Sequence, residues 1–87
     1  MKVAVWDTYV KRKDGLTMHF DIIVPQELKD EQQIYEFGKR YLQNKDVLTE
    51  QLSSKECNYC HIEEVSDSVL NDIKSKGFHI VELKNCL

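Results

Sequence analysis

Two apolar segments on either side of an Asp-Gly dipeptide constrain the fold of this chain more than any other feature. Residues 2–10 (KVAVWDTYV) and residues 16–24 (LTMHFDIIV) are rich in β-branched and aromatic side chains, and Asp14-Gly15 lies between them. Asp-Gly is a dipeptide that the type I′ turns of β-hairpins prefer. The sequence therefore predicts an N-terminal β-hairpin.

The turn also predicts which side chains share a face of the hairpin. If Asp14-Gly15 is the whole loop, Tyr9 lies opposite Phe20 on a mostly apolar face. Asp7 falls on that apolar face as well, where it either accepts hydrogen bonds or indicates an error in the register. The other face, which the helices are expected to leave open, carries Trp6, Thr8, His19 and Asp21.

Two amphipathic helices and two further strands are predicted after the hairpin. Asp30 and Gln33 have the spacing of a capping box for a helix that runs to about Asn44. Residues 59–65 are predicted as a third strand, residues 66–77 as a second helix that ends at a glycine, and residues 78–83 as a fourth strand. For residues 45–56, both a short edge strand and a helical turn remain open.

The expected fold is a two-layer α+β domain with the element order ββαβαβ. A strand-helix-strand unit normally makes a right-handed crossover between parallel strands, so the third and fourth strands are predicted to be parallel neighbours in a mixed four-stranded sheet. We expect both helices on one face, because two short helices cannot cover both faces of such a sheet. With 87 residues, the chain makes a single domain, residues 1–87, and is too short for a large multi-step enzyme.

Charge and hydropathy exclude several classes of partner. Twelve Lys and Arg residues against fifteen Asp and Glu residues give a net charge of -3, so we expect no surface for nucleic acid or anionic lipid. Residues 1–10 show neither an export signal nor a stretch long enough to span a membrane, and we expect a cytoplasmic protein. Three cysteines, an odd number, favour reduced thiols or metal ligands over a disulfide framework.

The motif CNYCH at residues 57–61 brings two thiols and an imidazole close together in the sequence. Zinc accepts such ligands, but a structural zinc site normally has four. Cys57, Cys60 and His61 supply at most three, and His79 at the start of the predicted neighbouring strand is the candidate for the fourth.

Three other interpretations of the motif compete with zinc. Thiol redox chemistry is less favoured, because the cysteines do not begin a helix and Glu56 lies beside them. Haem attachment is disfavoured by the small domain and by the N-terminal sequence, which shows no export signal. The simplest alternative is a structural role, since free cysteine is often buried.

The predicted open face offers a second candidate site. Thr8, His19 and Asp21 bring a hydroxyl, an imidazole and a carboxylate together there, beside Trp6. Nucleophilic catalysis uses such groups, but a flat sheet has no pocket or oxyanion donors, so we assign no catalytic residue. An exposed tryptophan beside polar groups is typical of a binding surface.

We therefore expect a non-enzymatic binding or interaction domain whose open sheet face contacts a protein partner or a second copy of the chain. The alternative function is a zinc-binding or thiol-redox site built on the motif at residues 57–61. A zinc site of that kind contributes folding energy, so a chelator is expected to lower the melting temperature of the protein.

Three segments of the chain resemble a known family. WDTYVKRKDG, MHFDIIVP and ECNYCHIEEV, in this order, are similar to a bacterial family catalogued as domain of unknown function number two thousand and twenty-four. The resemblance covers essentially the whole chain. It implies a small α+β domain with no assigned activity, so no catalytic role carries over. The family-like segments contain Trp6, Asp7, His19, Asp21, Cys57, Cys60 and His61.

Overall fold

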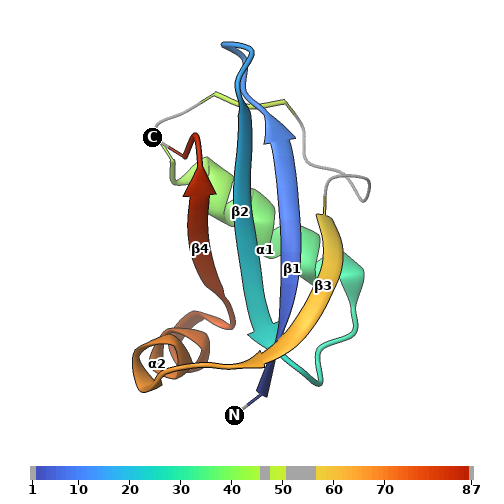
Figure 1. Cartoon of the computed structure of the whole chain (residues 1–87), viewed down its shortest axis with the longest axis vertical. Coiled ribbons are helices and arrows are strands. Elements are labelled where there is room, and N and C mark those ends of the chain that lie inside the picture. The colour runs from blue at the N-terminus through green and yellow to red at the C-terminus, as the bar shows by residue number, and fades with distance from the viewer. Residues whose placement is uncertain (1, 46–47, 51–56, 87) are drawn as a thin grey trace.

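The N-terminal hairpin forms the centre of a four-stranded sheet (Figure 1). The computed structural model describes residues 2–45, 48–50 and 57–86, with the side chain of Cys57 outside the described part. Strands β1 (Lys2–Lys11) and β2 (Thr17–Pro25) are flanked by β3 (Cys57–Glu64) and β4 (His79–Lys84) at the two edges, in the order β3-β1-β2-β4. The predicted hairpin and the element order ββαβαβ are confirmed.

All neighbouring strands are antiparallel, so the prediction of a mixed sheet with parallel third and fourth strands is wrong. Helix α2 (Asp67–Lys76) lies at the end of the sheet where β3 finishes and β4 begins (Figure 1). The two strands therefore run in opposite directions, and they lie at opposite edges. The more apolar hairpin strands occupy the two central positions and keep β3 and β4 apart. The crossover rule for parallel strands therefore does not apply to this pair.

The hairpin has a three-residue loop, which shifts the predicted register by one residue. The Arg12 N–H donates to the Leu16 carbonyl at 2.7 Å and the Gly15 N–H donates to the Arg12 carbonyl at 3.1 Å, with Gly15 at a φ of +97°. Three-residue loops of this kind combine a type I turn with a left-handed glycine. Asp7 consequently lies opposite Asp21, not Ile22, and the predicted register is wrong.

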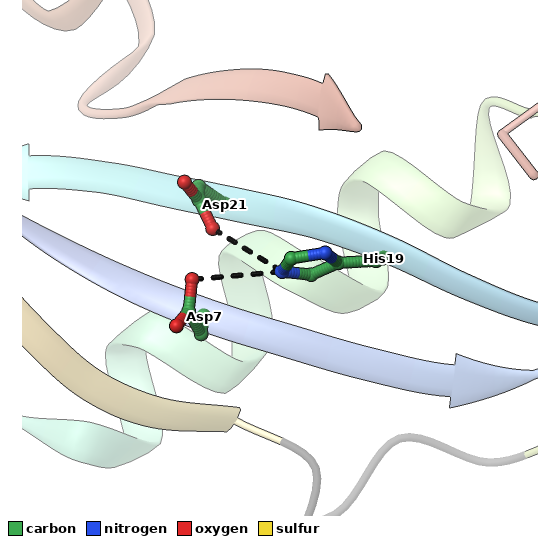
Figure 2. Close-up of side chains that lie close together, drawn as sticks. All are labelled: Asp7, His19 and Asp21. Carbon is green, nitrogen blue, oxygen red and sulfur yellow. Dashed lines mark ion pairs between the residues drawn. The ribbon is translucent and has the colours of Figure 1, made fainter. Parts of the chain in front are cut away.

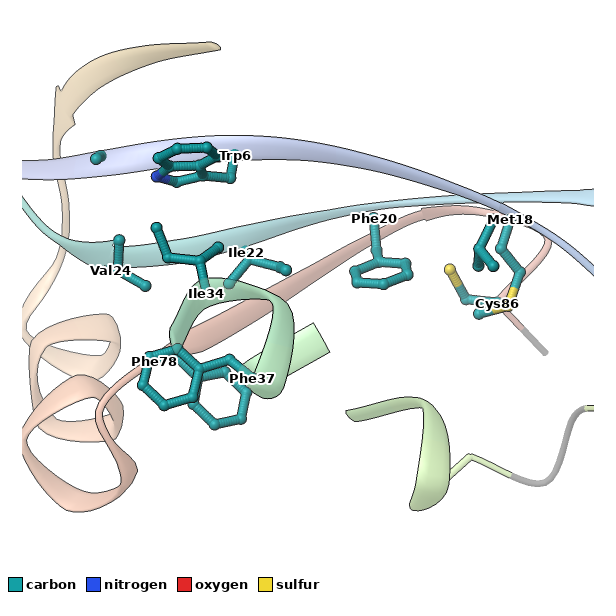
Figure 3. Close-up of a cluster of buried hydrophobic side chains, with 11 residues drawn as sticks. Trp6, Met18, Phe20, Ile22, Val24, Ile34, Phe37, Phe78 and Cys86 are labelled. Atoms are coloured by element: carbon teal, nitrogen blue, oxygen red, sulfur yellow. The ribbon is translucent and has the colours of Figure 1, made fainter. Parts of the chain in front are cut away.

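Helix α1 (Glu31–Gln43) covers one face of the sheet. Its N-cap is Asp30, as predicted, and the Asp30 side chain accepts a hydrogen bond from the backbone N–H of Gln32 at 3.1 Å. Figure 3 shows the buried core between α1 and the sheet. Residues that share this core include Trp6, Phe20, Ile22, Ile34, Phe37 and Phe78.

Helix α2 packs against the opposite face, so the prediction that both helices share one face is wrong. Ile73 of α2 joins a second buried cluster with Val3, Val5 and Ile23. These strand residues alternate with those that face α1, because successive side chains of a strand point to opposite faces. The strands are apolar on both faces at this end, and burial of both faces needs a helix on each side.

Beyond α2, neither described helix covers the second face of the sheet, and this open face carries the candidate site. Helix α2 ends where predicted, at Gly77, which adopts a left-handed φ of +93°.

Of residues 45–56, positions 46, 47 and 51–56 lie outside the described part, so the edge strand and helical turn considered there are not fully described. Thr49 forms one antiparallel bridge with Arg12. Neither described helix is long and apolar enough to cross a membrane.

Candidate functional site

Three polar side chains of the central hairpin converge on the open face of the sheet (Figure 2). Asp7 projects from β1, and His19 and Asp21 project from the same face of β2 because they are two residues apart. His19 Nε2 lies 3.6 Å from Asp7 Oδ1 and 3.8 Å from Asp21 Oδ1. One nitrogen and two carboxylate oxygens thus lie within 4.8 Å of one another.

Two of the three converging atoms are shielded from solvent and have unused hydrogen-bonding capacity. His19 Nε2 and Asp21 Oδ1 are buried and have no hydrogen-bond partner among the described residues. The side chains keep only 23% and 17% of their surface exposed, respectively. Buried polar atoms are normally hydrogen-bonded, and exceptions often mark the site of an ion, an ordered water or a catalytic group.

The two carboxyl groups perturb each other's ionisation. Desolvation, followed by the hydrogen bond and the charge of Asp7, raises the pKa of Asp21 to about 7. The hydrogen bond with Asp21 lowers the pKa of Asp7 below its ordinary value. Two carboxylates in contact cannot both ionise without a strong repulsion, so the pair holds one proton up to near-neutral pH.

Tyr9 holds the imidazole in place. Its ring stacks on His19 with a centroid distance of 4.1 Å and an interplanar angle of 10°. A hollow of about 520 Å³ reaches His19 from the hairpin tip, between Tyr9, Leu16 and Lys84. The stacking therefore orients the imidazole, and the hollow connects His19 to solvent.

The surface predicted from Trp6, Thr8, His19 and Asp21 is divided between the two faces of the sheet. Trp6 is 9% exposed and Thr8 is fully buried, and both face α1. His19 and Asp21 lie on the open face, so the predicted grouping of a hydroxyl, an imidazole and a carboxylate does not form. The cause is the three-residue loop, because a shift of one residue exchanges the faces of a strand.

Asp7 is the site residue that the sequence-based assignment of the open face missed. The predicted register placed its carboxylate among apolar side chains, where an unpaired charge is costly. That conflict was the available signal, since the alternative register pairs Asp7 with Asp21.

The motif at residues 57–61 lies on β3, next to β1. Cys60 is exposed, and its Sγ lies 3.0 Å from Nδ1 of His61, whose Nε2 lies 3.6 Å from Glu63 Oε2. The Cys60 thiol has a raised pKa because of desolvation and the neighbouring Asp7 carboxylate. A protonated thiol disfavours the redox interpretation.

His79 cannot complete a site with the motif, contrary to the sequence-based assignment. It lies on β4, at the opposite edge of the sheet from β3. Its Nδ1 lies 2.7 Å from Asp72 Oδ2 of α2. Cys57 is the first residue of β3, and the position of its side chain lies outside the described part.

Comparisons with known proteins agree with the fold. A family model described as a domain of unknown function (DUF2024) matches residues 1–83. The chain is similar to the NMR structure of protein NE1680 from Nitrosomonas europaea, a structural genomics target, with 36% sequence identity, a TM-score of 0.80 and coverage of 100% of both chains. No curated protein matches the sequence. These descriptions name no activity or ligand, so function has to be argued from the side chains.

Proposed function

The chain belongs to the DUF2024 family, which has no assigned activity, and we propose from its side chains that it binds a divalent transition-metal ion on the open face of the sheet. The ligands are Asp7, His19 and Asp21. The observation that carries the proposal is the convergence of their three ligand atoms within 4.8 Å, two of them buried without a hydrogen bond.

The distances between the ligand atoms fit a small metal ion. Zinc bonds to nitrogen and oxygen are about 2.0 Å long, which puts the ligands of a tetrahedral site about 3.3 Å apart. The separations from His19 Nε2 are 3.6 Å to Asp7 and 3.8 Å to Asp21. Shifts of a few tenths of an ångström therefore bring His19 Nε2 to the tetrahedral spacing from each carboxylate, and the two carboxylate oxygens lie within 4.8 Å of each other.

The charges of the site favour a cation. A divalent ion between Asp7 and Asp21 replaces the shared proton and removes the repulsion between the carboxylates. A set of one imidazole and two carboxylates suits Zn²⁺, Co²⁺ and Mn²⁺. Three protein ligands leave at least one position for water or another ligand.

Metal titration tests the proposal directly. Metal-free protein is titrated with Zn²⁺ at about pH 8, where Asp21 is ionised, and the heat of binding is measured. We expect one ion per chain, and His19→Ala and Asp21→Asn should each weaken binding by about tenfold or more.

His79→Ala is the matched control, because His79 also pairs with an aspartate but lies at the edge of the sheet. It should leave the affinity unchanged. Absence of stoichiometric binding, or equal losses in His19→Ala and His79→Ala, would refute the metal site.

A protein-interaction role of the same face is the second candidate function. Tyr9 is 47% exposed and Val81 is 36% exposed, and Val81 lies opposite Asp21 on the open face. Exposed apolar side chains around a polar centre are typical of contact surfaces. If this face mediates self-association, sedimentation velocity detects a dimer that Val81→Glu dissociates, and a strict monomer at all concentrations contradicts it.

A further inference from the structure

A β-bulge in β3 places Cys60 and His61 of the CNYCH motif on the face that carries the proposed metal site. Val5 lies opposite His61 and Trp6 lies opposite Tyr59, so Cys60 is an extra residue between the two pairs. Bulges re-aim side chains and occur frequently beside functional sites.

The bulge changes which residues of β3 share a face. Asn58 lies opposite Asp7, so its side chain is on the open face. Cys60 is two residues further along β3 and therefore points to the same face. His61 lies opposite Val5, a residue of the same face. Ile62 returns to the opposite face, where it packs against the main core. A regular strand would place Cys60 and His61 on opposite faces, whereas here both share the face of Asp7.

Cys60 shares the open face with Asp7, and the Asp7 carboxylate is one cause of the raised pKa of its thiol, after desolvation. Its sulfur lies outside the group of ligand atoms of Asp7, His19 and Asp21 that are within 4.8 Å of one another. Cys60 is exposed, and a cysteine side chain turns about a single torsion. Rotation about this torsion moves the sulfur over the open face, beside Asp7, without a change in the backbone.

We propose that Cys60 supplies a thiolate as the fourth protein ligand of this ion, which makes the site selective for Zn²⁺ and similar borderline metals over Mg²⁺, Ca²⁺ and Mn²⁺. This inference rests on the proposed function. The sulfur-metal bond forms as the thiol releases its proton to solvent, and the oxidation state of the metal does not change. Thiolate ligands select zinc-like metals, whereas oxygen ligands suit the harder ions.

Cobalt spectroscopy tests the thiolate separately from metal binding. Reduced, metal-free protein is titrated with Co²⁺, whose visible d–d bands report coordination by any ligands and whose near-ultraviolet charge-transfer band reports a sulfur ligand. We expect both bands in the wild type. Cys60→Ser should abolish the charge-transfer band and lower the Zn²⁺ affinity by roughly tenfold or more, while it changes the Mn²⁺ affinity less than about threefold.

Cys57→Ser is the matched control, because it removes the other thiol of the motif and should leave the charge-transfer band intact. Visible bands without a charge-transfer band would overturn the thiolate ligand and leave the proposed function standing. Loss of the charge-transfer band in Cys57→Ser but not in Cys60→Ser would identify Cys57 as the sulfur ligand and overturn the inference for Cys60. Absence of any cobalt binding would overturn both proposals.

Discussion

Replacement of Asp21 by asparagine should stabilise the metal-free protein above neutral pH. Asparagine has nearly the shape of aspartate but carries no charge, so Asp21→Asn removes the repulsion with Asp7 and keeps the packing. Wild type and variant should therefore differ in the pH dependence of stability. They should be similar in stability where the wild-type carboxyl is protonated in both the folded and the unfolded chain.

The size of the effect follows from the pKa of Asp21. This pKa rises from 3.8 to about 7 on folding, so the folded state binds the proton more tightly than the unfolded state. The stability that protonation contributes is complete below pH 3.8 and is lost as the pH rises to about 7. Each pKa unit is worth about 1.4 kcal/mol, which gives roughly 4 kcal/mol for the complete shift. Because Asp7 shares the proton and its own pKa is lowered, we expect about 2 kcal/mol between pH 5 and pH 8.

Urea denaturation at the two pH values, in the presence of a chelator, measures this difference. Wild type should lose about 2 kcal/mol of unfolding free energy relative to Asp21→Asn between pH 5 and pH 8. Glu27→Gln, which neutralises an exposed carboxylate, controls for general charge effects and should follow the wild-type profile. If the profiles of wild type and Asp21→Asn run parallel, the two carboxylates do not share a proton and the electrostatic argument for the site fails.

Three further predictions concern the site and the two cores. Below about pH 7, the Zn²⁺ affinity should fall by at least about tenfold per pH unit, because Asp21 must release a proton and a Cys60 thiolate ligand requires the release of a second. A competition titration showing constant affinity from about pH 5.5 to 7 would contradict this. Gly77→Ala should lower the melting temperature and cost about 1–2 kcal/mol in chemical denaturation, because the added Cβ meets a φ of +93° and would lie 3.2 Å from Phe37. Ile34→Ala should cost about 3–4 kcal/mol and Ile73→Ala about 2–3 kcal/mol by urea denaturation, since both are buried but Ile73 belongs to the smaller cluster. A cost below about 1 kcal/mol for Ile73→Ala would argue against α2 as the cover of the second face.

Local sequence signals correctly predicted the elements of the fold. The segments around Asp14-Gly15 form the hairpin, Asp30 caps α1 and Gly77 ends α2. Each of these features depends on interactions between residues that are near one another in the chain, such as a turn, a cap or a left-handed glycine. The resemblance to the family rested on residues of the same kind and is confirmed.

The candidate site was only half predictable, because its composition depends on the register of the hairpin. His19 and Asp21 were identified from the sequence, whereas Asp7 was assigned to the wrong face and Trp6 and Thr8 were wrongly grouped with the site. An Asp-Gly dipeptide is compatible with both a two-residue and a three-residue loop. The difference is a single residue, and it exchanges the two faces of the strand.

The sequence by itself determined which segments become strands and helices and where most of them begin and end, because those choices depend on short-range physics. Tertiary structure alone decided that β3 and β4 occupy opposite edges, that α1 and α2 cover opposite faces, and that a bulge places both Cys60 and His61 on the face of Asp7. These outcomes depend on how apolar surface is buried across the whole sheet, where residues far apart in the chain compete for the same neighbours. The polar cluster of Asp7, His19 and Asp21 lies on a part of one face that neither described helix covers.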